Sequence, residues 1–101
     1  MKAGFNELIK SETPTLVDFY ADWCGPCKAM APTLEKFSSK MGDKVKVIKI
    51  NVDKNQNAAS VYKVQSIPTL ILFQNGLIKW RQTGALSLGQ LEAAISPFVK
   101  F

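Results

Sequence analysis

Residues 15–32, TLVDFYADWCGPCKAMAP, contain a strand pattern, a tight turn and the start of a helix pattern. The first six of these residues are largely β-branched, apolar or aromatic, which predicts a strand buried on both faces. From Cys24 onward the apolar residues recur every three or four positions, which predicts a helix that ends near Gly42. Two cysteines, Cys24 and Cys27, therefore stand where a buried strand passes into a helix.

On either side of this stretch the sequence alternates between further helix and strand patterns. We expect a short helix near residues 5–9, strands at 45–52, 69–73 and 77–83, a weak helix at 55–61 capped by Asn55 or Asp53, and a last helix that begins with a capping box, Ser87 and Gln90. A strand–helix–strand unit implies a parallel pair with a right-handed crossover, and Asn75-Gly76 predicts an antiparallel hairpin. The order predicts an α/β fold, a mixed sheet of about four strands flanked by four helices on both faces.

The composition is that of one globular domain, which we expect to span residues 1–101. Hydrophobic residues make up 47% of the 101 residues and charged residues 21%. No apolar run approaches the ~18 residues of a membrane helix, and the N-terminus lacks the apolar segment of a secretory signal. The formal charge of +5 is spread along the chain, which favours a solvated basic surface over a nucleic-acid or membrane partner. The chain has no histidine, the commonest general base and metal ligand.

The placement of Cys24 and Cys27 at the start of a helix indicates redox chemistry. A helix N-terminus carries partial positive charge and free N–H groups, which favour an accessible thiolate at Cys24. Cys27 lies one turn later, within reach of Cys24 for a small disulfide. A structural disulfide would normally close a longer loop in a secreted protein, and two cysteines without histidine fall short of the four ligands of a zinc site. Unreactive core cysteines, or a metal shared by two chains, are the alternatives.

Asp18 and Lys49 lie within strand patterns among apolar neighbours, where ionisable side chains are rare unless paired. On adjacent parallel strands they would meet as a buried acid/base pair, in which burial raises the pKa of Asp18 and Lys49 lowers it. Alternatively, both side chains point to solvent at strand ends. Pro68 is by itself an ordinary proline at the start of a strand. Trp23 is either part of the core or an exposed aromatic beside the cysteines.

Three segments in sequence order resemble the thioredoxin family: TLVDFYADWCGPCKAMAP, SIPTLILFQNG and TGALS. The resemblance runs from about Phe5 to the last helix. It implies the thioredoxin-like fold and a redox-active disulfide between Cys24 and Cys27, with no bound cofactor and no metal. Many family members have an additional strand before the first helix. Because only four residues precede Phe5, we expect that strand to be absent or vestigial.

The same resemblance implies a role for each matching residue. Cys24 is the attacking cysteine, Cys27 the buried resolving cysteine, Asp18 a buried carboxylate that assists proton transfer at Cys27, and Lys49 its partner. Pro68 matches the cis-proline of the family, which would place the Ile67 backbone beside the dithiol. The apolar docking rim for the substrate would comprise Trp23, Gly25, Pro26, Ile67, Gly84 and Ala85.

The function that follows from the resemblance is a protein-disulfide reductase. It implies a cytoplasmic monomer that acts on disulfide-containing proteins and is recharged by a thioredoxin reductase with NADPH or reduced ferredoxin. Two other functions fit the same residues: a disulfide oxidase or isomerase, and a non-catalytic thioredoxin-fold binding subunit. The Gly-Pro pair between the cysteines resembles reductases more than oxidases.

Overall fold

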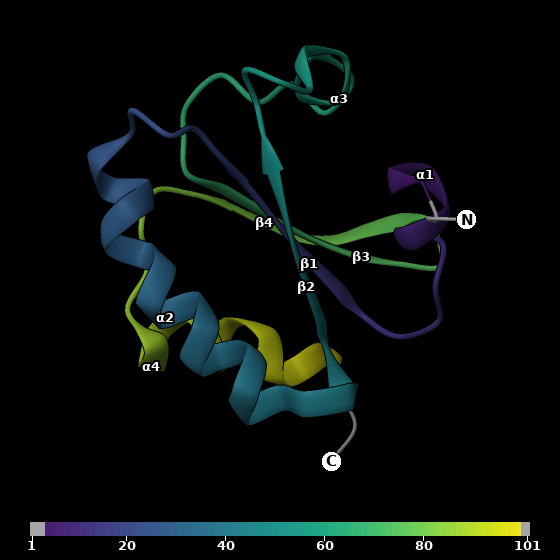
Figure 1. Cartoon of the computed structure of the whole chain (residues 1–101). Helices are drawn as coiled ribbons and strands as arrows, with labels where there is room; N and C mark the ends of the chain where they lie inside the picture. The colour runs from purple at the N-terminus through teal and green to yellow at the C-terminus, as the bar shows by residue number, and fades with distance from the viewer. Residues whose placement is uncertain (1–3, 100–101) are drawn as a thin grey trace.

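A four-stranded mixed sheet forms the centre of the molecule, and the computed structural model describes residues 4–99 (Figure 1). The helices and strands are α1 (Phe5–Leu8), β1 (Thr15–Tyr20), α2 (Gly25–Met41), β2 (Lys46–Asn51), α3 (Gln56–Val61), β3 (Thr69–Gln74), β4 (Leu77–Thr83) and α4 (Leu88–Ile95), with 3₁₀ turns at Gly42–Lys44 and Ser96–Phe98. This order of helices and strands confirms the sequence prediction. The expectation that no strand precedes α1 falls on residues 1–3, which lie outside the described residues.

The strands are arranged in the order β2-β1-β3-β4. β1 pairs parallel with β2 and antiparallel with β3, and β3 pairs antiparallel with β4. The hairpin between β3 and β4 turns through Asn75 and Gly76, whose φ angles of 55° and 79° are the positive values that a tight two-residue hairpin turn needs. The central strands β1 and β3 are buried on both faces, as their apolar runs predict.

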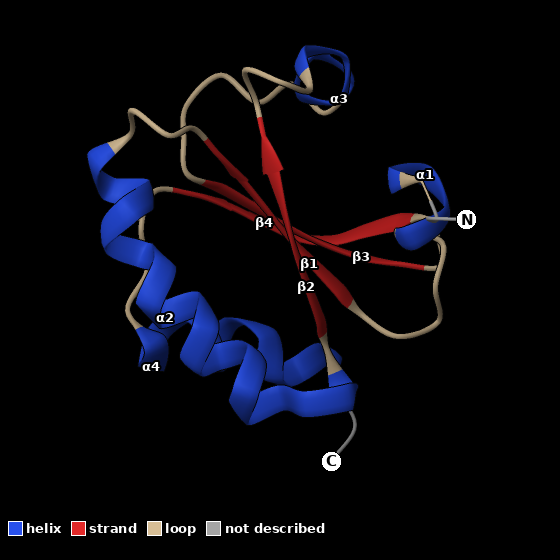
Figure 2. Ribbon diagram, in the orientation of Figure 1, coloured by secondary structure: helices blue, strands red, loops and turns tan. Residues whose placement is uncertain are grey.

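The two faces of the sheet carry different helices (Figure 2): α2 and α4 cover one face, and α1 and α3 lie over the other. Because side chains alternate along a strand, each face has its own core. Leu16, Leu70 and Leu72 pack with α2 and α4 residues such as Leu34 and Leu91. The second core lies under α1 and α3 and contains Ile9, Val17, Phe19, Ile71 and Phe73.

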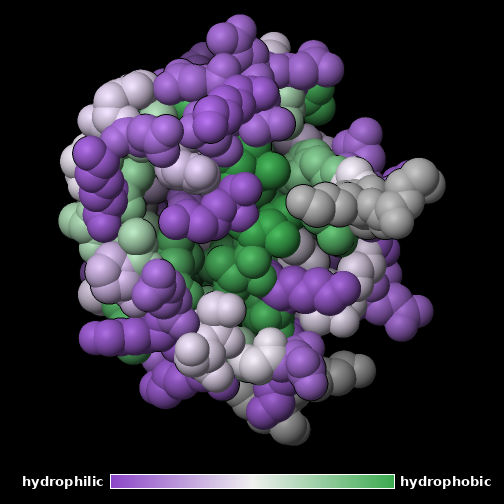
Figure 3. Space-filling model, viewed as in Figure 1, coloured by the Kyte–Doolittle hydropathy of each residue, from purple (hydrophilic) through white to green (hydrophobic). Residues whose placement is uncertain are grey.

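β2 forms one edge of the sheet and is only half-buried. Figure 3 shows a strip of apolar surface across the middle of the face seen in Figure 1, bordered by hydrophilic side chains. Lys46 and Lys49 are exposed on this edge strand. Lysines at such positions oppose the pairing of one sheet edge with another chain.

Candidate active site

Cys24 and Cys27 form a disulfide at the N-terminus of α2, with their Cα atoms 5.2 Å apart. Cys24 is the N-cap residue, and its Sγ accepts a hydrogen bond from the Cys27 backbone N–H at 3.2 Å. Pro26 lies in the first turn of the helix, where no backbone N–H is needed for the helical ladder. The sequence therefore places the Cys24 sulfur among the free N–H groups of a helix start, which stabilise negative charge.

Both cysteines are buried in the disulfide form. The exposed fractions are 4% for Cys24 and 6% for Cys27, so exposure does not separate an accessible cysteine from a buried one. Hydrogen bonding does separate them, since the Cys24 sulfur accepts the helix N–H. The pair packs with buried Ala21 and half-buried Ile67.

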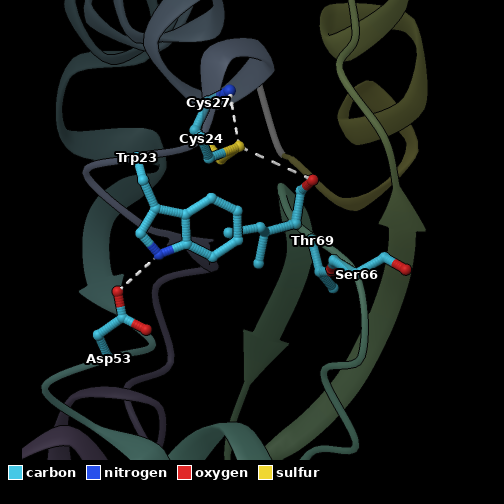
Figure 4. Close-up of a disulfide and its surroundings, with 7 residues drawn as sticks. Trp23, Cys24, Cys27, Asp53, Ser66 and Thr69 are labelled. Carbon is cyan, nitrogen blue, oxygen red and sulfur yellow. Dashed lines mark hydrogen bonds between the residues drawn. A yellow bond between two sulfur atoms is a disulfide. The ribbon is translucent and has the colours of Figure 1, made fainter.

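The segment before β3 faces the disulfide. The peptide bond between Ile67 and Pro68 is cis, and the Ile67 carbonyl oxygen lies 3.9 Å from Cys24 Sγ (Figure 4). Thr69 Oγ1 donates to the Ser66 carbonyl at 2.6 Å, which ties the start of β3 back to this segment. The Gly84 backbone N–H donates to the Pro68 carbonyl at 2.8 Å. Residues far apart in the sequence, from Cys24 through Ile67 to Gly84, thus meet at one place.

Trp23 is exposed rather than part of the core, with 70% of its surface open to solvent. Its indole Nε1 donates to Asp53 Oδ2 at 2.8 Å, and Figure 4 shows this nitrogen turned toward Asp53 and away from the disulfide. Of the other residues in the expected docking rim, Gly25, Pro26 and Ala85 are exposed, and Gly84 and Ile67 are half-buried.

Asp18 and Lys49 are opposite one another in the register of β1 and β2, but their environments differ. Asp18 is 2% exposed, and its Oδ1 has no hydrogen-bond partner among the described residues. Burial raises the pKa of Asp18 to about 6, and the positive charge of Lys49 opposes that rise. Lys49 itself is exposed, with its Nζ 5.1 Å from the centre of the Tyr20 ring. Asp18 and Lys49 are therefore not the buried pair that was expected, because Asp18 is buried and Lys49 is exposed.

Cys27 and Lys49 share a recess. Its volume is about 340 Å³, and it is also lined by Tyr20, Asp22 and Lys28. Asp18 lies on the same side of the sheet, because Leu16, two residues earlier in β1, packs with the α2 residues Met30 and Leu34. The recess therefore opens on the side of the sheet that also carries Asp18, although Asp18 does not line it.

One residue of this region, Asp53, was not predicted from the sequence as part of the site; it accepts the hydrogen bond from Trp23. A signal for it was present, because the carboxyl ends of parallel strands meet at one edge of a sheet. Trp23 follows β1 and Asp53 follows the parallel strand β2.

Among the described residues no group of three or more His, Cys, Asp or Glu side chains is arranged to hold a metal ion. No helix in that part of the chain is both long and apolar enough to cross a membrane.

Comparison with known proteins gives one consistent family. The family model named Thioredoxin matches residues 1–97. The chain is 49% identical over 90 residues to Thioredoxin Y, chloroplastic, of Oryza sativa subsp. japonica, which covers 88% of this chain and 54% of that protein. It is 46% identical to Thioredoxin of Acidithiobacillus ferridurans (86% of this chain, 81% of the other) and 42% identical to Thioredoxin 1 of Chlorobaculum tepidum (94% and 95%). The chain thus spans about half of the rice protein and most of both bacterial ones.

Proposed function

The chain belongs to the thioredoxin family and is a thiol–disulfide reductase, and we propose that Cys24 is its attacking sulfur and Cys27 its resolving sulfur. One observation carries this assignment of roles: the Cys24 sulfur accepts a backbone N–H at the start of α2. Once the disulfide is reduced, the same N–H and the helix N-terminus favour the thiolate of Cys24. The thiolate is the form of cysteine that attacks a disulfide.

The reaction then runs in two exchanges, and two electrons pass from the dithiol to the substrate. The Cys24 thiolate attacks one sulfur of a substrate disulfide, forms a mixed disulfide and releases the other substrate sulfur as a thiolate. The Cys27 thiol loses its proton and attacks Cys24 Sγ, which releases the second substrate sulfur. The products are a substrate dithiol and the disulfide between Cys24 and Cys27, the form that the structure contains.

Asp18 is the proposed acceptor of the Cys27 proton. Its buried, unpartnered Oδ1 has an open position for a proton, and a pKa of about 6 leaves it largely ionised at neutral pH. Asp18 and Cys27 lie on the same side of the sheet, which supports a proton transfer between them. Lys49 supports the ionised form of Asp18 by lowering its pKa.

The proposed docking rim for a substrate protein comprises Trp23, Gly25, Pro26, Ile67, Gly84 and Ala85. The buried Pro68 is proposed to support this rim next to Ile67. The hydrogen bond from Gly84 to the Pro68 carbonyl and the 3.9 Å between Ile67 O and Cys24 Sγ support this grouping. A substrate chain that lies on this rim would bring its disulfide to Cys24.

Each turnover oxidises the dithiol, so the protein needs a partner that returns two electrons to it. By family membership we assign this role to a thioredoxin reductase, and we propose a monomer in the cytoplasm, where thiols are kept reduced. Neither a bound cofactor nor a metal enters the proposed reaction.

The test is reduction of insulin with dithiothreitol as the electron source. We expect turnover with the wild-type chain, only the background rate of dithiothreitol with Cys24→Ser, and a trapped mixed disulfide to insulin with Cys27→Ser. Unchanged turnover after Cys24→Ser would refute the nucleophile assignment. A reduction potential close to that of protein disulfide isomerase would instead indicate an oxidase or isomerase.

A further inference from the structure

The side chain of Trp23 projects into solvent, with 70% of its surface exposed. An indole in this situation turns freely about its side-chain bonds unless a polar contact fixes it. The hydrogen bond from Nε1 to Asp53 Oδ2, at 2.8 Å, is such a contact, and it is charge-assisted because the acceptor is a carboxylate.

Asp53 is itself tied to the sheet. Its backbone N–H donates to Asn51 Oδ1 at 2.9 Å, and Lys54 N–H donates to the same oxygen at 3.4 Å. Asn51 is buried, and it is the last residue of β2, in register with Tyr20 of β1. Its Nδ2 also donates to Asp22 Oδ2, next to Trp23, at 3.5 Å. Hydrogen bonds in the turn after β2 therefore connect the sheet to Trp23, the residue that precedes Cys24.

We propose that Asp53 is a positioning residue for protein substrates, which holds the exposed indole of Trp23 in one orientation beside the disulfide. This inference rests on the proposed docking role of Trp23. Because the indole is already fixed in the free protein, the Trp23 side chain loses no conformational freedom when a substrate chain binds against it. Without Asp53 that freedom is lost at each docking event, which corresponds to roughly a 2- to 12-fold weaker affinity for one side chain.

The consequence is selective. A protein substrate covers the rim and contacts the indole, whereas a small neutral disulfide reaches the sulfur without covering Trp23. Asp53 therefore affects the KM for protein disulfides and leaves the chemical step alone, because its carboxylate contacts the indole and not the sulfurs.

The experiment compares Asp53→Ala, which removes the acceptor, with Asp53→Asn, which keeps an acceptor oxygen without the charge. Asp43→Ala is the matched control, since it removes an exposed carboxylate from the 3₁₀ turn at the other end of α2. Pre-reduced protein is mixed with increasing concentrations of insulin or of 2-hydroxyethyl disulfide, and its single oxidation is followed by acid quench. Here KM and kcat denote the half-saturating disulfide concentration and the limiting rate of that single turnover. We expect Asp53→Ala to raise the KM for insulin 2- to 12-fold with kcat unchanged, and Asp53→Asn and Asp43→Ala to remain near wild type. All three should reduce 2-hydroxyethyl disulfide as the wild type does.

Two further readouts separate positioning from a general structural effect. The indole N–H resonance of Trp23, assigned by its loss in Trp23→Phe, should exchange faster with solvent in Asp53→Ala than in wild type or Asp53→Asn. Trp23→Phe keeps a ring but has no donor, so combining it with Asp53→Ala should add no further rise in KM.

The proposal is overturned by an unchanged KM for insulin in Asp53→Ala, by an equal loss with the small disulfide, or by an Asp53→Asn variant as impaired as Asp53→Ala. These results leave the reductase assignment intact. Failure of the wild-type chain to reduce insulin would instead contradict the proposed function.

Discussion

Replacing Asp18 by asparagine should make the protein more stable at neutral pH and alter how stability depends on pH. Burial raises the pKa of this carboxyl from 3.8 to about 6. Between those two values the unfolded chain releases the proton while the folded chain keeps it, so stability falls as pH rises, by about 1.4 kcal/mol per pH unit. Above about pH 7 this difference in pKa destabilises the folded chain by roughly 3 kcal/mol. Below about pH 3, where Asp18 is protonated in both states, the destabilisation is absent.

The assay is urea unfolding of the oxidised wild type and Asp18→Asn at several pH values from 3 to 8. The asparagine amide has its own burial cost, but that cost does not depend on pH. The decisive quantity is therefore the change with pH in the difference between the two unfolding free energies, which should be about 3 kcal/mol in favour of the variant. Asp43→Asn, at an exposed carboxylate, should track the wild type throughout. Parallel curves for wild type and Asp18→Asn would show that Asp18 has an ordinary pKa and would remove the basis for its role in proton transfer.

Three further changes test the packing and local structure that support the site. Leu91→Ala, in the core between α4 and the sheet, should cost about 2–5 kcal/mol in urea unfolding, whereas Leu77→Ala at an exposed position should cost under about 0.5 kcal/mol. Ser87→Ala removes the acceptor for the Gln90 N–H and should lower the unfolding free energy by about 1 kcal/mol in thermal melts, whereas Ser39→Ala, exposed within α2, should leave it unchanged within about 0.5 kcal/mol. Gly76→Ala forces a side chain into a φ of 79° and should cost about 1–2 kcal/mol by the same measurement; no loss would show that the hairpin relaxes.

Much of the fold was predictable because its local signals agree with its tertiary structure. The apolar runs of β1 and β3 correspond to the two central strands, and Asn75-Gly76 forms the expected hairpin turn. The capping box at Ser87 and Gln90 has both of its hydrogen bonds. The weak helix α3 shows the limit of such signals. Asn55 occupies its N-cap position but makes no capping bond, and its Nδ2 donates instead to the Asn51 carbonyl at 3.0 Å.

The site was predictable in part, for the same physical reason. A spacing of three residues at a helix start brings Cys24 and Cys27 together locally, so the sequence is sufficient. Asp18 and Lys49 are opposite one another in the register of β1 and β2, which is one of the two arrangements that the sequence left open. The exposure of Lys49 does not follow from the strand pattern, because it depends on β2 being an edge strand. The bond between Trp23 and Asp53 joins residues 30 positions apart, and it depends on how two turns meet at one edge of the sheet.

The stability that Asp18 costs the folded chain and its proposed role in proton transfer have the same cause, which is burial. A penalty of roughly 3 kcal/mol is large beside the 5–15 kcal/mol that typically separates folded from unfolded domains. An asparagine at this position would avoid that penalty, but it would have no proton site in the range where enzymes work. Burial is the cause both of the penalty and of the raised pKa, and a pKa near neutrality is what a group needs to accept a proton from one sulfur and return it in the next cycle. If this reasoning is correct, Asp18→Asn should gain stability and lose rate in the Cys27 step together, and a variant that gains stability with full turnover would separate the two.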